Sequence, residues 1–121
     1  MKLGVMIQLR GDLEEKFRET KEMGFSYAQL SNWEDSAETD ENAALVVSLC
    51  EKYGIKLSTY WRGWEGPREW NFLEGPATLG LVPVAFRAIR LQNLKRGSDF
   101  AKKIGVNSIA THVGFLPENP N

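Results

Sequence analysis

Apolar and polar residues alternate along this chain with two different periods, which divide it into short strands and longer helices. Runs rich in apolar and β-branched residues predict strands over 2–9, 26–31, 55–61 and 106–113. Between these runs, apolar residues recur at three- and four-residue spacing, which is typical of helices with one buried face. The regular exchange of strand and helix predicts βα units and a parallel sheet.

Three helices are expected between the strands. Asp12 and Asp40 are expected to cap the first two, because a carboxylate accepts hydrogen bonds from the free N–H groups of a first turn. The third follows Pro83, and Gly97 within it predicts a bend or a close contact. The expected buried faces are Leu13, Phe17, Thr20 and Met23; then Leu45, Val46, Leu49, Cys50 and Tyr53; then Phe86, Ile89, Leu94, Ala101 and Ile104.

A weak internal repeat marks the end of each helix. The stretches KEMGFSYAQLS, EKYGIKLSTYW and KKIGVNSIATHVG each place a glycine between a charged helix end and an apolar strand. Gly24, Gly54 and Gly105 are therefore expected in a left-handed backbone conformation just past a helix. The third unit is delayed by residues 62–82, which contain several Gly and Pro residues and predict an ordered rim loop.

Two folds with a parallel sheet suit this order of elements. One is a small flavodoxin-like doubly wound sheet, and the other is part of a (β/α)₈ barrel. A whole barrel needs about 250 residues, so 121 residues would supply about half of one. The last predicted strand has no helix after it, which favours the barrel. We therefore expect an α/β fold of the TIM-barrel type with about four βα units in one structural unit.

Composition narrows the function classes. Hydrophobic residues make up 42% and charged residues 26% of the chain, with a net charge of −1. This balance gives no reason to expect nucleic acid or a membrane surface as a partner, and no apolar run is long enough to span a bilayer. Cys50 is the only cysteine, so no disulfide can form within the chain. A reducing, cytoplasmic location and an inert core thiol are expected.

Aromatic residues gather where the strands of a parallel sheet end, which is where such folds place their sites. All four tryptophans follow strand ends: Trp33, Trp61, Trp64 and Trp70. Aromatic faces stack on the C–H faces of sugars, while sugar hydroxyls need fixed polar partners. The alternative is that these rings pack the 62–82 loop. Both readings stay open for Trp64 and Trp70, whereas the position of Trp61 favours the site.

His112 is the sharpest candidate for chemistry, because it is the only histidine and closes the last predicted strand. In a regular strand it shares a face with Ser108 and Ala110, which would put the imidazole at a barrel mouth. There it could ligate a metal or hydrogen-bond a substrate oxygen. The alternative is a structural histidine tied to the backbone. Glu65 and Glu118 are loop carboxylates that could act as bases or bind hydroxyls, although most loop glutamates are solvated.

Two stretches carry a family resemblance. NFLEGPATLGLVP (71–83) and FRAIRLQNLKRGSDFAKKIGVNSIATHVGFLPE (86–118) resemble the sugar phosphate isomerase/epimerase family, the xylose isomerase-like TIM barrels, with endonuclease IV a more distant relative. The resemblance implies an eight-stranded barrel with a divalent metal: Mn²⁺, Mg²⁺, Co²⁺ or Zn²⁺. The metal polarises a hydroxy-carbonyl pair while acidic residues move a proton between adjacent carbons.

The resemblance also implies roles for single residues. His112 corresponds to the family's fourth-strand histidine beside the substrate, and Trp61 to its third-strand aromatic. Trp33 and Glu118, chosen for their positions after strand ends and not from the resemblance, complete the expected substrate-binding set. The family's metal ligands come from strands five to eight, so we expect residues 1–121 to form the N-terminal half of a barrel that ligates no metal alone. The isolated chain would be inactive.

The expected partners are a sugar or sugar phosphate and whatever completes the barrel. That could be the missing C-terminal half, or a second copy pairing edge to edge in a homodimer. A second hypothesis is a non-catalytic carbohydrate-binding or self-assembling half-barrel. A third, a nuclease like endonuclease IV, is disfavoured because a zinc cluster needs several histidines and DNA needs a basic surface.

Overall fold

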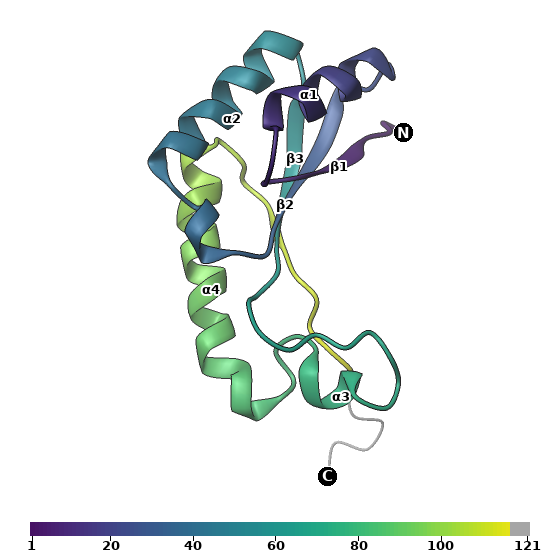
Figure 1. Cartoon of the computed structure of the whole chain (residues 1–121), viewed down its shortest axis with the longest axis vertical. Helices are drawn as coiled ribbons and strands as arrows, with labels where there is room; N and C mark the ends of the chain where they lie inside the picture. Colours follow the sequence, from purple (N-terminus) through teal and green to yellow (C-terminus); the bar gives the residue numbers. More distant parts are fainter. Residues whose placement is uncertain (117–121) are drawn as a thin grey trace.

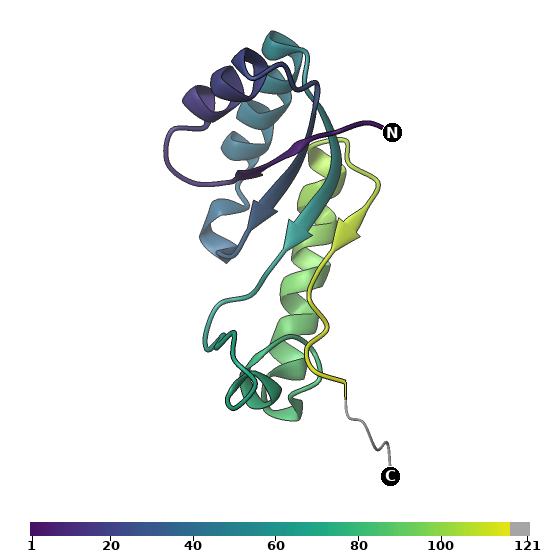
Figure 2. The ribbon, with the colours of Figure 1, turned by 90° about the vertical axis from the view of Figure 1, so that its right-hand side faces the viewer.

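The computed structural model describes residues 1–116, in which a parallel sheet is covered on one face by helices (Figures 1 and 2). The strands lie in sequence order across the sheet, each parallel to the next: β1 (Val5–Gln8), β2 (Tyr27–Asn32), β3 (Lys56–Arg62) and β4 (Ile109–Ala110). A doubly wound sheet would reverse its strand order at a switch point. The sequential order instead matches half of a TIM barrel, as predicted.

Three long helices form the covering layer: α1 (Leu13–Glu22), α2 (Asp40–Tyr53) and α4 (Val84–Lys103). Asp12 caps α1 as predicted, by accepting a hydrogen bond from the backbone N–H of Glu15. The cap of α2 is Thr39 and not Asp40, because the Thr39 hydroxyl accepts from the N–H of Asn42 at 3.1 Å. Asp40 is the first helical residue, where its charge still favours the helix N-terminus.

The glycines of the sequence repeat have the predicted left-handed backbone, with φ of 85° at Gly24, 64° at Gly54 and 72° at Gly105. The outer strands are shorter than expected. Strand β4 pairs with β3 only through Tyr60–Ile109 and Trp61–Ala110. Beyond it the chain runs alongside the rim loop instead of a strand. Two short helices, η1 (Asp35–Ala37) and α3 (Gly75–Thr78), were not predicted.

The apolar core fills the space between the sheet and the helix layer, with buried residues from both sides: Ile7, Leu30 and Tyr60 from strands, and Phe17, Val46 and Phe100 from helices. Three expected core residues are exposed instead: Met23 (60%), Leu45 (41%) and Ile89 (60%). Met23 lies at the end of α1. On α4 the buried positions near Ile89 belong to Arg90 and Asn93, because this part of the helix packs on polar groups.

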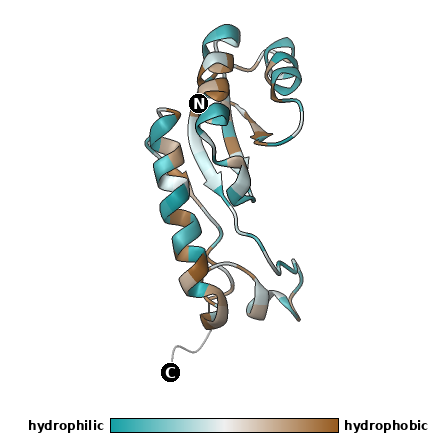
Figure 3. Cartoon of the chain, turned by 60° about the vertical axis from the view of Figure 1, so that its left-hand side comes forward, coloured by the Kyte–Doolittle hydropathy of each residue, from teal (hydrophilic) through white to brown (hydrophobic). Residues whose placement is uncertain are grey.

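Helix α4 is therefore only partly amphipathic. Its first turns carry hydrophobic residues, and hydrophilic residues spread along the rest of its surface (Figure 3). Gly97 makes the close contact that its position predicted: a Cβ atom there would lie 2.8 Å from Cγ of Arg62. No helix in the part of the chain that the structure describes is long and apolar enough to cross a membrane.

An irregularity in β3 decides which side chains face the uncovered side of the sheet. Ala28 pairs with Leu57, but Gln29 pairs with Thr59, so Ser58 is an extra residue in β3. After this bulge, Tyr60 points into the core and Trp61 points away from it. The register then aligns one residue from each strand on the uncovered face: Gln8, Ser31, Trp61 and Ala110.

Candidate functional site

The four tryptophans form one cluster at the C-terminal ends of the strands, with Trp33 at its centre. The ring centroid of Trp33 lies 4.7 Å from that of Trp61, 5.5 Å from Trp64 and 6.4 Å from Trp70. Each pair meets edge to face, a favourable geometry for aromatic rings. The expected gathering of the tryptophans at one end of the molecule is thus present.

Gly63 allows Trp33 to sit in this cluster. A Cβ atom at residue 63 would lie 2.2 Å from Cε3 of Trp33, so the indole rests directly on the backbone of the β3 end. The turn that contains Trp33 is held by Asn32, whose side-chain oxygen accepts from the N–H of Glu34 at 3.1 Å and whose amide donates to the Glu34 carbonyl at 2.7 Å. Both contacts fix the direction in which Trp33 leaves β2.

His112 joins the cluster through Trp70. Their ring centroids are 5.0 Å apart and nearly perpendicular. The Nδ1 atom of His112 accepts a hydrogen bond from the backbone N–H of Gly114 at 3.0 Å. A neutral imidazole that accepts at Nδ1 carries its proton on Nε2. His112 is thus hydrogen-bonded to the backbone, as expected for a structural histidine. Its Nε2–H group is still available as a donor to a ligand.

Trp64 has a packing role. It is 1% exposed, its indole N–H donates to the Pro67 carbonyl at 3.3 Å, and the guanidinium of Arg90 lies 4.7 Å above its ring. Trp64 therefore anchors the rim loop, which was one of its two sequence interpretations. Trp70 is 57% exposed, while Trp33 and Trp61 are half-buried, so these three rings can be reached from solvent.

Two arginines of α4 hold the rest of the rim loop. Arg90 is buried and donates to the carbonyls of Gly80 at 2.6 Å and Pro67 at 2.9 Å. Burial lowers the pKa of its guanidinium. Arg87 lies on the surface and donates to the carbonyls of Leu81 and Val82 at 2.8 and 2.7 Å. Residues 62–82 are therefore an ordered rim, as predicted.

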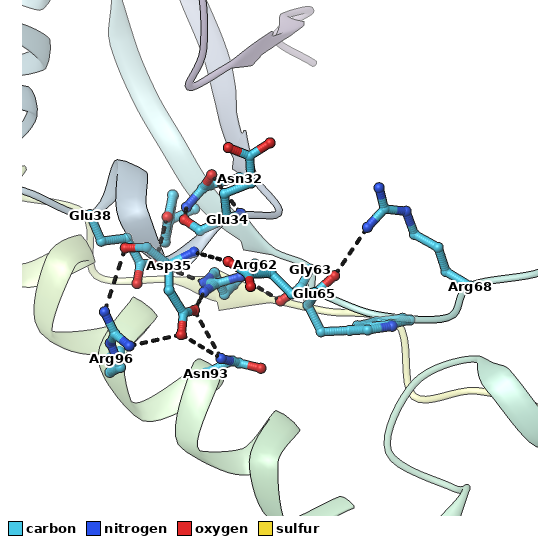
Figure 4. Close-up of polar contacts among 12 residues, drawn as sticks. Asn32, Glu34, Asp35, Glu38, Arg62, Gly63, Glu65, Arg68, Asn93 and Arg96 are labelled. Carbon is cyan, nitrogen blue, oxygen red and sulfur yellow. Dashed lines mark hydrogen bonds and ion pairs between the residues drawn. The ribbon is translucent and has the colours of Figure 1, made fainter. Parts of the chain in front are cut away.

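A charged cluster beneath the tryptophans joins three elements, and Asp35 is its centre (Figure 4). The Asp35 carboxylate accepts from Arg62 on β3, from Asn93 at 2.8 Å and from Arg96 at 2.7 Å, the last two on α4. Arg62 is fully buried, so this pairing compensates a charge that would otherwise be very unfavourable there. The backbone N–H of Asp35 also donates to Glu65 at 2.9 Å.

Glu38 gives Arg62 a second partner. Its carboxylate lies 2.8 Å from Nε of Arg62 and accepts a hydrogen bond from the Tyr60 hydroxyl, also at 2.8 Å. Burial, and then the charge of Glu38, raise the pKa of Tyr60. The phenol therefore stays a donor across the physiological range. Two carboxylates and two guanidinium groups balance in the cluster, which fixes the strand ends that carry Trp33 and Trp61.

These residues do not fit a metal ion. Within residues 1–116 no group of three or more His, Cys, Asp or Glu side chains could hold one. The carboxylates of Asp35 and Glu38 are engaged by Arg62, and Glu65 accepts from the backbone of Asp35. The described residues at this edge of the sheet can stack against a ligand and form hydrogen bonds with it.

The predicted site residues lie at one edge of the sheet wherever the structure describes them. Trp61 contacts Trp33, and Trp33 is linked to His112 through Trp70. Glu118 lies outside the described residues. Sequence reasoning missed the pairing of Asp35 with Arg62; the signals that could have indicated it were their positions just after strands and the glycine in the middle of α4.

Solved structures share this fold, although no family model and no curated protein matches the chain. The chain superposes on a xylose isomerase domain protein from Planctomyces limnophilus with a TM-score of 0.88 and 27% identity over 98% of its length. It superposes on D-psicose 3-epimerase, solved in the presence of D-fructose (0.60; 15%), and on an AP endonuclease of family 2 from Brucella melitensis (0.61; 11%), each also over 98% of its length.

The parallel sheet, with its strands in sequence order, has the fold of half a TIM barrel, and it is similar to the corresponding part of xylose isomerase-like TIM barrels. The predicted resemblance to that class is confirmed by these neighbours. The chain spans only 43%, 40% and 43% of the three neighbouring chains, respectively.

Proposed function

We propose that this chain supplies substrate-binding residues to a sugar or sugar phosphate isomerase or epimerase. The observation that carries the proposal is the cluster of Trp33, Trp61 and Trp70 beside the N–H donor of His112, at the C-terminal ends of the strands. Parallel α/β folds bind their ligands at this end. The likeness to an epimerase and to a xylose isomerase domain protein supports the reaction class.

In this proposal each group has a distinct task. The indole faces of Trp33 and Trp61 receive the C–H face of the sugar, and His112 donates from Nε2 to a sugar oxygen. A donor at a carbonyl oxygen stabilises the negative charge that develops there when a proton leaves the adjacent carbon. Glu118 is a further proposed polar contact to the sugar hydroxyls.

The divalent metal implied by the family resemblance would polarise the hydroxy-carbonyl pair of the substrate. Residues 1–116 do not fit such an ion, so we assign them binding and orientation only. Under this proposal, metal-binding residues belong to the part of the barrel that this chain does not span. We therefore expect the chain alone to bind sugars without converting them.

A second candidate is a non-catalytic carbohydrate-binding half-barrel, which the same cluster of Trp33, Trp61 and Trp70 would serve. Both candidates predict binding of D-fructose or D-psicose that changes tryptophan fluorescence. We expect Trp61→Ala and His112→Gln each to weaken binding about tenfold, in line with the loss of a stacking or hydrogen-bonding contact of about 1.4 kcal/mol. Leu73→Ala, at an 89% exposed residue of the rim loop, is the control.

A test for interconversion of the sugars distinguishes the isomerase or epimerase from the non-catalytic binding module. The chain would be combined with the part of the Planctomyces limnophilus protein that it does not match, in the presence of Mn²⁺, and interconversion of the sugars followed by NMR. Conversion that is lost in His112→Gln supports the isomerase proposal. Binding without conversion in a correctly assembled complex supports the binding module. Absence of any sugar binding contradicts both.

A further inference from the structure

A small cavity of about 40 Å³ lies between the ends of β1 and β2, next to the aromatic cluster. We propose that it binds an anionic group, carboxylate or phosphate, of an acidic sugar derivative. This inference rests on the proposed sugar-binding function and names its substrate class. The residues that carry it are Arg10, Arg68, Gln8, Ser31, Trp33 and Glu34, all of which line the cavity.

Arg68 is held in place without using up its donors. The carbon at the centre of its guanidinium lies 4.7 Å from the Trp33 ring centroid, and Nη1 donates to the Trp64 carbonyl at 3.3 Å. Stacking occupies the face of a guanidinium, whereas its N–H groups point outward in the plane. In Figure 4, Arg68 stands apart from the cluster around Asp35. Its remaining N–H groups are thus available to an anion.

Arg10 brings a second cation to the lining of the cavity. It follows β1, whose end is held by Lys16: the ammonium group donates to the carbonyls of Gln8, at 3.2 Å, and of Arg10. Within residues 1–116 neither Arg10 nor Arg68 pairs with a carboxylate. By contrast, Arg18, Arg62 and Arg96 do. Two uncompensated guanidinium groups at one cavity are the arrangement that carboxylates and phosphates bind best.

One carboxylate opposes this charge. Glu34 lines the same cavity and is exposed. Against it stand Arg10, Arg68 and the nearby ammonium group of Lys16, so the charge around the cavity remains positive. Glu34 is also an acceptor that a sugar hydroxyl next to the anionic group can use.

The size and direction of the cavity match an acidic sugar. A cavity needs about 10–15 Å³ to hold one water, so 40 Å³ takes a group of roughly three heavy atoms, the size of a carboxylate; a phosphate would protrude to the solvent. From the cavity, Gln8 and Ser31 lead across the uncovered face to Trp61 in one register row. The anionic group can occupy the cavity while the sugar ring lies over Trp33 and Trp61.

Calorimetric titration of the full chain with two matched pairs of probes tests this inference. The pairs are D-glucuronate with D-glucose, and D-fructose 6-phosphate with D-fructose; inorganic phosphate is titrated as well. We expect the charged member of at least one pair to bind about tenfold more tightly than the neutral one, and added salt to reduce only this difference. Arg10→Gln and Arg68→Gln should each reduce the advantage about fivefold or more, and Arg10→Gln should leave the binding of the neutral sugars unchanged.

Arg18→Gln, at an exposed arginine of α1 that pairs with Glu15 and Glu22, is the control and should change neither affinity. Preference for D-glucuronate alone identifies a carboxylate site, and preference for D-fructose 6-phosphate alone a phosphate site. Equal binding of charged and neutral sugars overturns the anion cavity but leaves the proposed function intact. Binding of phosphate that depends on Arg10, with no sugar bound, upholds the cavity and overturns the proposed function. No binding of any probe overturns both.

Discussion

Arg62 shows how one buried charge constrains the residues around it. Its side chain is fully buried between β3 and α4, held by Asp35 and Glu38, and its methylene groups press against the backbone of Gly97. A charge in such a position needs both paired carboxylates and enough space for its stem. The glycine in the middle of α4 provides that space.

Gly97→Ala tests this contact. Glycine to alanine in a helix normally stabilises by about 1 kcal/mol. Here the new Cβ would lie 2.8 Å from Cγ of Arg62, which the salt bridges prevent from moving freely. We expect overpacking to lower the free energy of unfolding by about 1–3 kcal/mol. Urea unfolding measures this free energy, with Ser98→Ala at an exposed position of the same helix as the control. Equal effects of the two substitutions would contradict the close contact between Gly97 and Arg62.

Cys50 is the other residue whose environment predicts a measurable property. Burial, and then the charge of Glu51, raise the pKa of its thiol from 9.0 to about 11. The folded state therefore disfavours the thiolate. Below pH 9 the thiol is protonated in both the folded and the unfolded states, so this group does not lower the free energy of unfolding. As the pH rises from 9.0 to about 11, the thiol of the unfolded chain ionises first, and the free energy of unfolding falls.

We therefore expect iodoacetamide to alkylate folded Cys50 at pH 8 about a hundred times more slowly than an unfolded cysteine, since two pKa units change the thiolate fraction by that factor. Absorbance at alkaline pH would follow the thiolate directly. A titration midpoint near that of a free thiol would contradict the prediction. The same titration of Cys50→Ala is the blank.

The sequence predicts the role of a single residue when that role depends only on its neighbours in the chain. The glycines that end helices and the Asp12 cap depend on neighbouring residues, so the pattern is sufficient to place them. The strand pattern alone does not predict the burial of Arg62, because the fold brings its partners Asp35 and Glu38 to it from another element.

Among the elements, the short helix η1 has the largest effect on the site. It places Asp35 and Glu38 under the ends of β2 and β3, where they reach Arg62 and, through Asp35, the side chains of α4. The Glu65 contact extends the same connection to the rim loop. The element is only one turn long, so its sequence carries no periodicity by which it could have been predicted.

Asp35→Asn tests the connection. The change keeps the shape of the side chain but removes the charge that pairs with Arg62 and Arg96. Removing one partner of a buried pair costs about 3–5 kcal/mol; Glu38 still pairs with Arg62, so we expect a loss of about 2–3 kcal/mol. Arg96→Gln should lose no more than about 1 kcal/mol, because Arg96 is 56% exposed. Thermal unfolding measures the loss of stability in both variants. Similar losses would contradict the conclusion that Asp35 holds the buried charge of Arg62.

The order of elements was more predictable than their lengths. The helix periodicity and the repeat glycines place α1, α2 and α4, while β1 and β4 each have one pairing partner and shorten to the residues in register. The sequence pattern predicts an apolar face through Ile89 in the N-terminal half of α4. The structure buries Arg90 and Asn93 there because the helix meets the rim loop and the charged cluster instead of the apolar core.

For the whole molecule, the main feature is a parallel sheet whose outer strands, β1 and β4, each have one unpaired edge within residues 1–116. Met6 of β1 is 57% exposed, and its partner residue Gln29 lies on the same uncovered face. Unpaired edges of this kind associate with other strands. A twofold axis along the strands would let β1 of each copy pair in parallel with β4 of the other, which closes eight strands.

We therefore expect the chain to self-associate at tens of micromolar, which analytical ultracentrifugation measures as a mass that rises toward twice that of one chain. Met6→Lys should shift the equilibrium toward single chains, because a charge on the edge opposes pairing. Leu45→Lys, on the exposed side of α2, should have no effect. A single-chain mass at every concentration would contradict edge pairing.

The extra residue in β3 has one more consequence for the whole molecule. The bulge at Ser58 reverses the parity of every later residue in the strand, so Trp61 lies toward the aromatic cluster and Arg62 lies inside the protein. A β3 that kept Ser58 but paired it regularly with β2, without the bulge, would exchange these two sides. The indole would then enter the space of the salt bridges, and the guanidinium would stand at the mouth of the half-barrel. One unpaired serine thus decides whether that mouth is aromatic or cationic.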